Sequence, residues 1–318
     1  MKSADQLKKS GASESSVDPR IEGASGLSNN VSSGVSNPRV IALLNQKGGV
    51  GKTTSTANLG AAFALAGLRT LVVDLDPQSN LSLHFGHEPA PDQPTVRDLF
   101  MNPDIAASEL IRQARANLWF IPSDTELALV EGELALQPNM QHILAERLAP
   151  VMPSFDVLLL DCPPSLGVLT VNALTIADEV VVPTQAQYLA LRGLEKLLET
   201  VLLVQRALNS RLKVSGVLLC MHESQSSHGK AVVEEMDNYF AKFRGSGLPW
   251  EDAVVLRPAV RRNIKLAEAP SFGQTIFDYA PTCAGAADYR ALAEALRQRW
   301  KPVESRADLA TSAGIAAS

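Results

Sequence analysis

The chain has 318 residues, of which 46% are apolar and 20% charged, and its formal net charge is −5. This length suffices for one large α/β domain or two small ones, and the acidic balance restricts any DNA role to a local basic patch, because Lys and Arg bind phosphates. No apolar run approaches the roughly 18 residues of a membrane helix, and the N-terminus lacks the compact apolar stretch of a signal peptide, so we expect a cytoplasmic protein.

The chain is expected to fold as one α/β domain between two tails. Residues 1–38 and 302–318 are small and polar without periodicity, which predicts flexible tails. Within 39–301 the predicted strands are Arg39–Asn45, Thr70–Asp74, Leu118–Pro122, Val157–Asp161, Glu179–Val182, Val214–Leu219 and Ala253–Leu256. Helical patterns between them include Lys52–Ala66, Leu189–Leu208 and Ala287–Arg299. Short apolar strands separated by helices indicate a single doubly wound, mainly parallel sheet with helices on both faces.

A glycine-rich loop follows the first predicted strand and precedes the first predicted helix. It reads KGGVGKTT and consists of Lys47, Gly48, Gly49, Val50, Gly51, Lys52, Thr53 and Thr54. In this context the glycines let successive N–H groups point at phosphates, the Lys52 side chain reaches the β- and γ-phosphates, and the Thr53 hydroxyl ligates Mg²⁺. The loop departs from the usual G-x-x-x-x-G-K-[ST] spacing, because Gln46 replaces the first glycine. We therefore predict an ATP and Mg²⁺ site in a P-loop NTPase fold.

This variant loop resembles that of the ParA/MinD family of ATPases. The resemblance implies that Lys47 is the family's signature lysine, which reaches across a homodimer interface to the partner's phosphates. A lysine supplied in trans makes hydrolysis depend on dimerisation, as an arginine finger makes it depend on a partner.

Two predicted strands end in acidic residues, and ligands of parallel sheets bind at the carboxyl ends of strands. The first strand ends in Asp74, with Asp76 two residues later, and the second ends in Asp161. Asp161 fits the carboxylate that holds a Mg²⁺-bound water in P-loop ATPases. The family resemblance assigns Asp76 to orienting the attacking water and to the metal's shell. For Asp74, a structural role and a direct role both stay open.

Later segments resemble the ParA/Soj branch of the family, and the resemblance covers roughly residues 39–298. It is carried by Asn172–Gln185 and by Arg262–Gly273, read RNIKLAEAPSFG. It implies that Asn263 contacts the adenine base and that Arg262 binds DNA nonspecifically. Arg261 stands where this branch usually has proline, and the run from Met221 to Gln225 lacks the arginine that relatives carry there.

Basic residues gather in two places that are candidates for DNA contacts. The first group is Arg261, Arg262 and Lys265, and the second is Arg290, Arg297, Arg299 and Lys301. In a dimer each group is present twice, so duplex phosphates could span both subunits without sequence being read. The alternative interpretation is a solvated basic face, since the chain is acidic overall.

The function expected from these features is a weak ATPase, stimulated by a ParB-like partner, that rides on the nucleoid and segregates a chromosome or plasmid. Two alternatives stay open: an orphan ParA-like protein that positions a protein cargo, and a MinD-like membrane-bound positioning ATPase. The membrane alternative needs a basic amphipathic C-terminal helix, which residues 304–318 do not supply. The cysteines Cys162, Cys220 and Cys283 are scattered, which disfavours disulfides, zinc and an iron–sulfur electron-transfer ATPase. The tail also lacks the tyrosine cluster of a bacterial tyrosine kinase.

Overall fold

The computed structural model describes residues 37–88, 90, 93–134, 137–187, 190–223 and 227–300. All of them belong to the unit Val31–Ser318. The predicted tails, apart from residues 37 and 38, lie outside the described residues, as do Gln225 and Lys301.

The strands of the described residues form one sheet. They are β1 (Arg39–Leu43), β2 (Thr70–Asp74), β3 (Arg112–Arg115), β4 (Leu118–Ile121), β5 (Val157–Asp161), β6 (Glu179–Thr184), β7 (Lys213–Leu219) and β8 (Val254–Leu256). Their order is β3-β4-β2-β5-β1-β6-β7-β8. All neighbours pair in parallel except β3 and β4. The predicted fold class is therefore confirmed, and β1 lies where the chain switches from winding one way across the sheet to the other.

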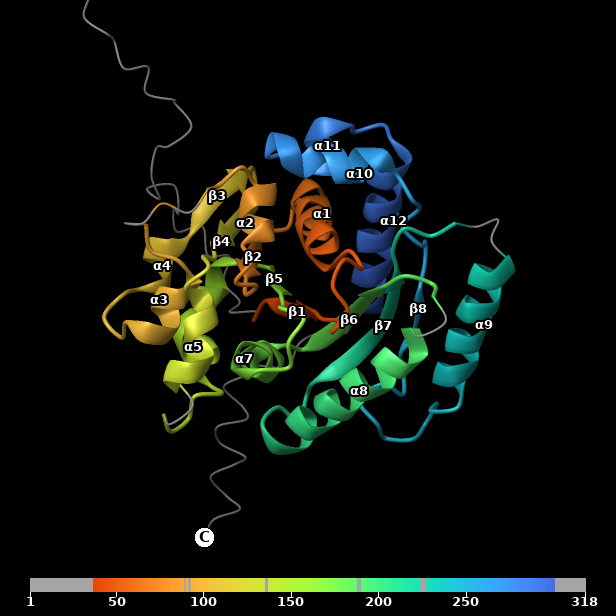
Figure 1. Cartoon of the computed structure of the whole chain (residues 1–318), viewed down its shortest axis with the longest axis horizontal. Coiled ribbons are helices and arrows are strands. Elements are labelled where there is room, and N and C mark those ends of the chain that lie inside the picture. Colours follow the sequence, from red (N-terminus) through yellow and green to blue (C-terminus); the bar gives the residue numbers. More distant parts are fainter. Residues whose placement is uncertain are drawn as a thin grey trace, which may run out of the picture. The chain divides into compact units, whose positions relative to one another are not determined.

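Helices connect the strands on both faces of the sheet (Figure 1). They are α1 (Lys52–Leu65), α2 (Asn80–His84), α3 (Val96–Met101), α4 (Ala107–Leu110), α5 (Leu127–Leu134), α6 (Ile143–Leu148), α7 (Val168–Ile176), α8 (Ala190–Ala207), α9 (Ser227–Ala241), α10 (Ile264–Glu268), α11 (Ile276–Tyr279) and α12 (Ala284–Arg299). Two 3₁₀ turns, η1 (Met152–Ser154) and η2 (Ala269–Phe272), complete the set. Within the described part of the chain, no helix has the length and apolar character needed to cross a membrane.

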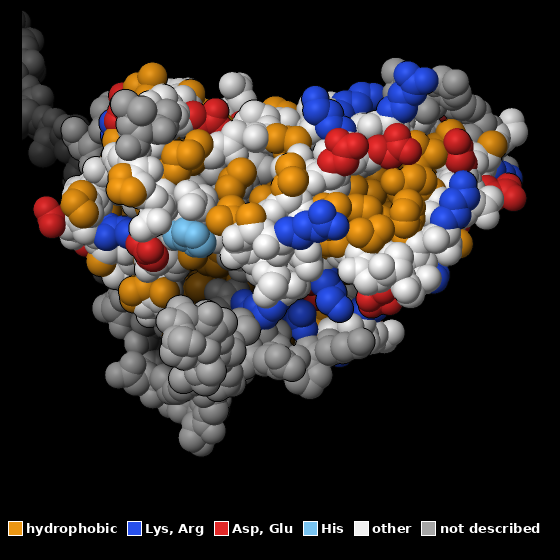
Figure 2. All heavy atoms as spheres, turned by 90° about the horizontal axis from the view of Figure 1, so that it is seen from below, with side chains coloured by type: hydrophobic (Ala, Val, Ile, Leu, Met, Phe, Trp, Pro, Cys, Tyr) orange, Lys and Arg blue, Asp and Glu red, His pale blue; other side chains and the backbone are white. Residues whose placement is uncertain are grey.

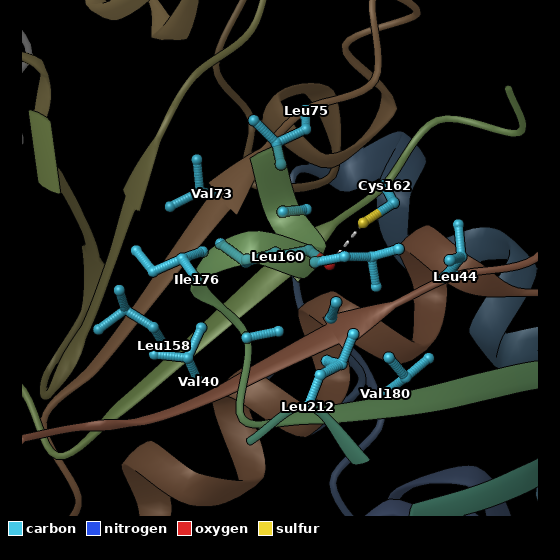
Figure 3. Close-up of a cluster of buried hydrophobic side chains, with 14 of the residues drawn as sticks. Val40, Leu44, Val73, Leu75, Leu158, Leu160, Cys162, Ile176, Val180 and Leu212 are labelled. Atoms are coloured by element: carbon cyan, nitrogen blue, oxygen red, sulfur yellow. Dashed lines mark hydrogen bonds between the residues drawn. The ribbon is translucent and has the colours of Figure 1, made fainter. Parts of the chain in front are cut away.

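Alternate residues of each strand supply two separate hydrophobic cores, because successive side chains of a strand point to opposite faces. Val40 and Ala42 face the core that α3–α9 cover. Ile41 and Leu43 face the core under α1 and α12. Figure 3 shows part of the first core, where Val40, Val73 and Leu158 meet from neighbouring strands. The near-continuous apolar runs in the sequence therefore reflect burial on both sides.

The edge strand β3 was not predicted. Its sequence, RQAR, has no apolar run, and its residues are only half-buried or exposed. It pairs antiparallel with β4 through a register shift. Polar residues are typical of an edge strand, which contributes little to the core and so leaves no apolar signal.

Candidate active site

The predicted phosphate loop connects β1 to α1 at the carboxyl edge of the sheet. Gly49 has φ +70° and Gly51, the residue before α1, has φ +96°. Such left-handed conformations are strained for residues with a side chain, so glycine is required at both positions. Lys47, Gly48 and Gly49 are exposed, whereas Val50 is buried and holds the loop to the domain. The exposed backbone amides can therefore meet a ligand at the N-terminus of α1.

The two lysines of the loop have different surroundings. The Lys52 side chain is 7% exposed, and its Nζ donates to the Lys47 carbonyl at 3.5 Å. Lys47 is exposed, and its Nζ donates to Gln187 Oε1. The Lys47 backbone N–H donates to Asn45 Oδ1 at 2.9 Å, which fixes where the side chain leaves the loop. One ammonium is therefore held inside the site and the other at its outer edge.

Asp161 lies beneath the loop and is fully buried at the end of β5. Thr56 Oγ1 donates to its Oδ1 at 3.0 Å, and the Thr53 side chain is close enough to influence its pKa. Burial raises the pKa of Asp161 to about 7, although the hydrogen bonds from Thr53 and Thr56 lower it. Among the described residues, no group hydrogen-bonds to its buried Oδ2. A buried oxygen of this kind needs a partner.

The residues present fit a hydrated Mg²⁺ ion. Mg²⁺ binds oxygen ligands, keeps several waters and uses one or two carboxylates. The Thr53 hydroxyl and the unpartnered Asp161 Oδ2 provide such oxygens on one side of the loop. Asp76, which follows β2, is 7% exposed and its Oδ1 accepts the Gln78 N–H at 3.0 Å.

Asp74 stands opposite Asp161 in the register of β2 and β5. It is fully buried and accepts three hydrogen bonds, from the Asp76 N–H at 3.2 Å, the Ser82 N–H at 2.9 Å and the Ser82 hydroxyl at 2.8 Å. Burial and, to a smaller extent, the nearby Asp161 together raise the pKa of Asp74 to about 8, although the hydrogen bonds from Ser82 and Asp76 oppose the rise. These contacts give Asp74 a structural role in holding the segment between β2 and α2.

Sequence reasoning missed two glutamines that contact the loop. Gln185 and Gln187 follow the carboxyl end of β6, the other neighbour of β1. Gln185 Nε2 donates to the Gly49 carbonyl at 3.0 Å, and Gln187 accepts from Lys47. The rule that identified the aspartates, that ligand-binding side chains follow the carboxyl ends of strands, would also have found them.

The segment predicted to contact the adenine base lies at the start of α10. Asn263 is half-buried and caps this helix, because its Oδ1 accepts the Lys265 N–H at 2.9 Å. The preceding residues extend the sheet edge: His222 N–H donates to Val260 O at 2.9 Å, and Arg262 N–H donates to His222 O at 3.2 Å. The segment is thereby fixed beside the end of β7.

The predicted DNA-contacting arginines are ion-paired. Arg261 forms a bidentate pair with Asp288, with Arg261 Nη2 at 2.7 Å and Nε at 3.0 Å from its carboxylate oxygens. Arg262 Nε lies 3.0 Å from Glu223, and both of these side chains are more than half exposed. Arg261 is therefore tied into the domain, while the Arg262 pair is a solvent-exposed contact of small energy.

The other two predicted DNA contacts, Lys265 and Arg290, also differ from each other in whether a carboxylate pairs with them. Lys265 Nζ lies 2.8 Å from Glu268, whereas the exposed Arg290 lies over the Phe277 ring at 5.3 Å from its centroid. On the face drawn in Figure 2, basic side chains also lie in small groups with acidic ones beside them. Phosphates would thus have to compete with carboxylates at Arg262 and Lys265.

Comparisons with known proteins agree with this geometry. A sequence model of the AAA domain family matches residues 38–214. The chain is 42% identical over 257 residues to sporulation initiation inhibitor protein Soj of Bacillus subtilis, covering 80% of this chain and 97% of Soj. It is 39% identical over 269 residues to chromosome partitioning protein ParA of Myxococcus xanthus, covering 84% and 91%.

A solved structure is similar over nearly its whole length. This is cobyrinic acid a,c-diamide synthase from Mycobacterium smegmatis with bound ATP analogue and magnesium, with a TM-score of 0.71 and 36% identity, covering 83% of this chain and 96% of that one. The match of the family model over more than half of the chain, and the identity to Soj and ParA over most of their length, agree with the loop and the carboxylates beneath it. The chain belongs to the ParA/Soj family of P-loop ATPases.

Proposed function

We propose that this protein is a Mg-ATP-driven dimerisation switch that holds DNA without sequence preference and segregates a chromosome or plasmid with a ParB-like partner. The observation that carries the proposal is the pair of lysines in one loop, Lys52 held inside the site and Lys47 exposed at its edge. Relatives named as chromosome partitioning proteins support the cellular role.

The nucleotide half of the proposal assigns roles to named atoms. The loop amides from Gly48 to Thr54 bind the phosphates, and Lys52 Nζ contacts the β- and γ-phosphate oxygens. Thr53 Oγ1 and Asp161 Oδ2 would hold Mg²⁺, which would supply positive charge to neutralise the phosphates. Asp76 orients the attacking water, so that hydrolysis yields ADP and phosphate. The base would lie near Asn263.

The assembly half of the proposal depends on Lys47. Its ammonium lies at the outer edge of the loop, where a second subunit can present phosphates to it. An ATP-bound pair of subunits then completes the shared site, and hydrolysis removes the γ-phosphate that holds the pair together. A ParB-like partner accelerates this step and so sets how long the dimer lasts.

DNA binding by the dimer is proposed to use Arg262, Lys265 and Arg290, with Arg261 held in place by Asp288 as a support. Because Glu223 and Glu268 already pair with Arg262 and Lys265, a single subunit offers phosphates few free cations. Two subunits double the number of contacts, which makes binding conditional on ATP. The protein would then reside on the nucleoid.

Two alternatives to DNA segregation are the positioning of a protein cargo and positioning on a membrane. The name of one similar structure, a diamide synthase, suggests a third, the ATP-dependent synthesis of an amide. These alternatives predict different dependences. Hydrolysis would respond to DNA and a partner in the first proposal, to anionic lipid in the membrane alternative, and to a carboxylic acid acceptor in the synthesis.

The test is nonspecific duplex-DNA binding measured with ADP, with ATP, and with ATP for the Arg262→Glu variant, across a salt series. Arg206→Glu is the matched control, because Arg206 is an exposed arginine in the last turn of α8, outside both predicted groups. We expect binding only with ATP, a steep fall with salt, and about a tenfold or larger loss in Arg262→Glu alone.

Equal binding by the Arg262→Glu and Arg206→Glu variants would remove Arg262 from the DNA surface. If DNA is ignored in every nucleotide state while ATP still drives dimerisation, the ATPase assignment stands and the DNA assignment fails. Sedimentation with anionic vesicles then tests the membrane alternative.

A further inference from the structure

A buried polar contact lies directly behind the phosphate loop. Ser55, in the first turn of α1, is 0% exposed and Tyr289, on α12, is 1% exposed, and their hydroxyl oxygens are 3.0 Å apart. Ser55 Oγ is also 3.5 Å from Cys220 Sγ. Burying hydroxyls costs free energy unless they are hydrogen-bonded, and their mutual bond provides most of that compensation. A phenylalanine at 289 would fill the same apolar space, so packing alone does not account for the pair.

Ser55 is joined to the loop through Gly51. The Ser55 N–H donates to the Gly51 carbonyl at 2.9 Å, which closes the first turn of α1. A Cβ built on Gly51 would lie 3.2 Å from both Cβ and Sγ of Cys220, so the loop rests closely on the end of β7. A shift of Ser55 therefore displaces the turn that begins with Lys52.

The other end of the contact reaches the predicted DNA segment. Tyr289 follows Asp288, which is 4% exposed. The Asp288 carboxylate accepts hydrogen bonds from the guanidinium of Arg261 and, at 3.0 Å, from the Arg261 backbone N–H. Figure 1 shows α12, which carries both residues, beside α1. One turn of α12 thus contacts Ser55, directly after the phosphate loop, with one residue and Arg261, ahead of α10, with the residue before it.

We propose that the Ser55–Tyr289 hydrogen bond positions the phosphate loop for nucleotide, and that Asp288 joins this contact to the Arg261 segment. Tyr289 acts through Ser55 and touches no phosphate, so it is a positioning residue. The inference rests on the proposed function only in that the loop binds ATP. It adds a mechanical link through α12 between the nucleotide and the predicted DNA surface.

The test is titration of the full chain with a fluorescent ATP analogue and Mg²⁺, at a temperature where every variant is folded. The variants are Tyr289→Phe, Ser55→Ala, their double variant and Asp288→Asn. Tyr279→Phe is the matched control, because it also removes one hydrogen-bonded phenol hydroxyl, which lies on α11 and donates to Glu268 at 2.8 Å rather than to Ser55. We expect about 3- to 10-fold weaker binding for Tyr289→Phe and Ser55→Ala, and no further loss in the double variant.

The outcomes separate the parts of the inference. Wild-type affinity in Tyr289→Phe, or an equal loss in Tyr279→Phe, would overturn the positioning role, and additive losses in the double variant would show that the two hydroxyls act separately. Wild-type affinity in Asp288→Asn would overturn the link to Arg261. If the wild-type chain itself binds no ATP, the proposed function fails instead, which distinguishes the two failures.

Discussion

Two carboxylates only two residues apart, Asp74 and Asp76, have different roles because their surroundings differ. Asp74 is fully buried and accepts three hydrogen bonds that fold the chain between β2 and α2. Asp76 lies beyond the strand end, close enough to Asp161 to act on it electrostatically. We predict that Asp74→Asn lowers the free energy of unfolding by about 1–3 kcal/mol, because the amide keeps one accepting oxygen and replaces the other with an NH₂ group that cannot accept. Urea unfolding measures the loss.

Asp76→Asn serves as the comparison. It is expected to change the free energy of unfolding by about 1 kcal/mol or less, since the amide oxygen can still accept the Gln78 N–H, and to abolish ATP hydrolysis. If Asp74→Asn leaves stability intact while stopping hydrolysis, Asp74 has the direct role that the sequence left open.

At the scale of elements, α1 lies against the sheet at a glycine. A Cβ on Gly60 would be 2.9 Å from Val72 Cγ2 and 3.3 Å from Leu118 Cδ1. We predict that Gly60→Ala destabilises the protein by about 1–3 kcal/mol, because the overpacking outweighs the helix propensity that alanine adds. Thermal or urea unfolding provides the measurement.

The matched variant is Gly132→Ala in α5, where nothing lies within 4 Å of the added Cβ. There alanine should stabilise by up to about 1 kcal/mol. The same sign of effect at both glycines would mean that α1 can move away from the sheet, and that the loop at its start is less firmly held than the packing indicates.

Much of this element structure could be predicted from the sequence. Every predicted strand is present with bounds within two residues of those observed, because burial on both faces gives each strand an apolar run. The start of α1 after Gly51 could also be predicted, since glycines that adopt left-handed conformations and the helix that follows them are recognisable within one short segment of sequence. The polar edge strand β3 left none. The last helix begins at Ala284 rather than Ala287, where Cys283 caps it through its sulfur.

At the scale of the whole molecule, the contacts that the sequence could not predict are those between distant segments. Nothing local to Arg261 indicates that Asp288 binds it, and nothing local to Ser55 indicates Tyr289. The basic residues near Arg261 were therefore interpreted as a patch, although several are paired with carboxylates. Local motifs report chemistry that one segment performs, whereas pairing depends on how the fold brings α12 to α1.

If Lys47 acts in the site of the partner subunit, the Lys47→Ala and Asp76→Ala variants should complement each other. If Lys47 acts on the partner's phosphates, the Lys47→Ala subunit keeps every residue of its own site and lacks only the lysine that it supplies to its partner's site. An Asp76→Ala subunit lacks its own water-orienting group but still offers Lys47. Each variant alone should therefore be inactive in hydrolysis, while each should still bind ATP through Lys52 and Thr53.

Mixing the two variants in equal amounts should restore hydrolysis to about a quarter of the wild-type rate, because half of the dimers are mixed and each has one complete site of two. The rate of the mixture should rise with total protein concentration, since it follows the mixed dimer. A mixture as inactive as its components would place Lys47 in its own subunit's site, and the contact with Gln187 would then mark its working position. Restored hydrolysis would show that Lys47 acts across the dimer interface, and that it couples ATP binding to dimer formation.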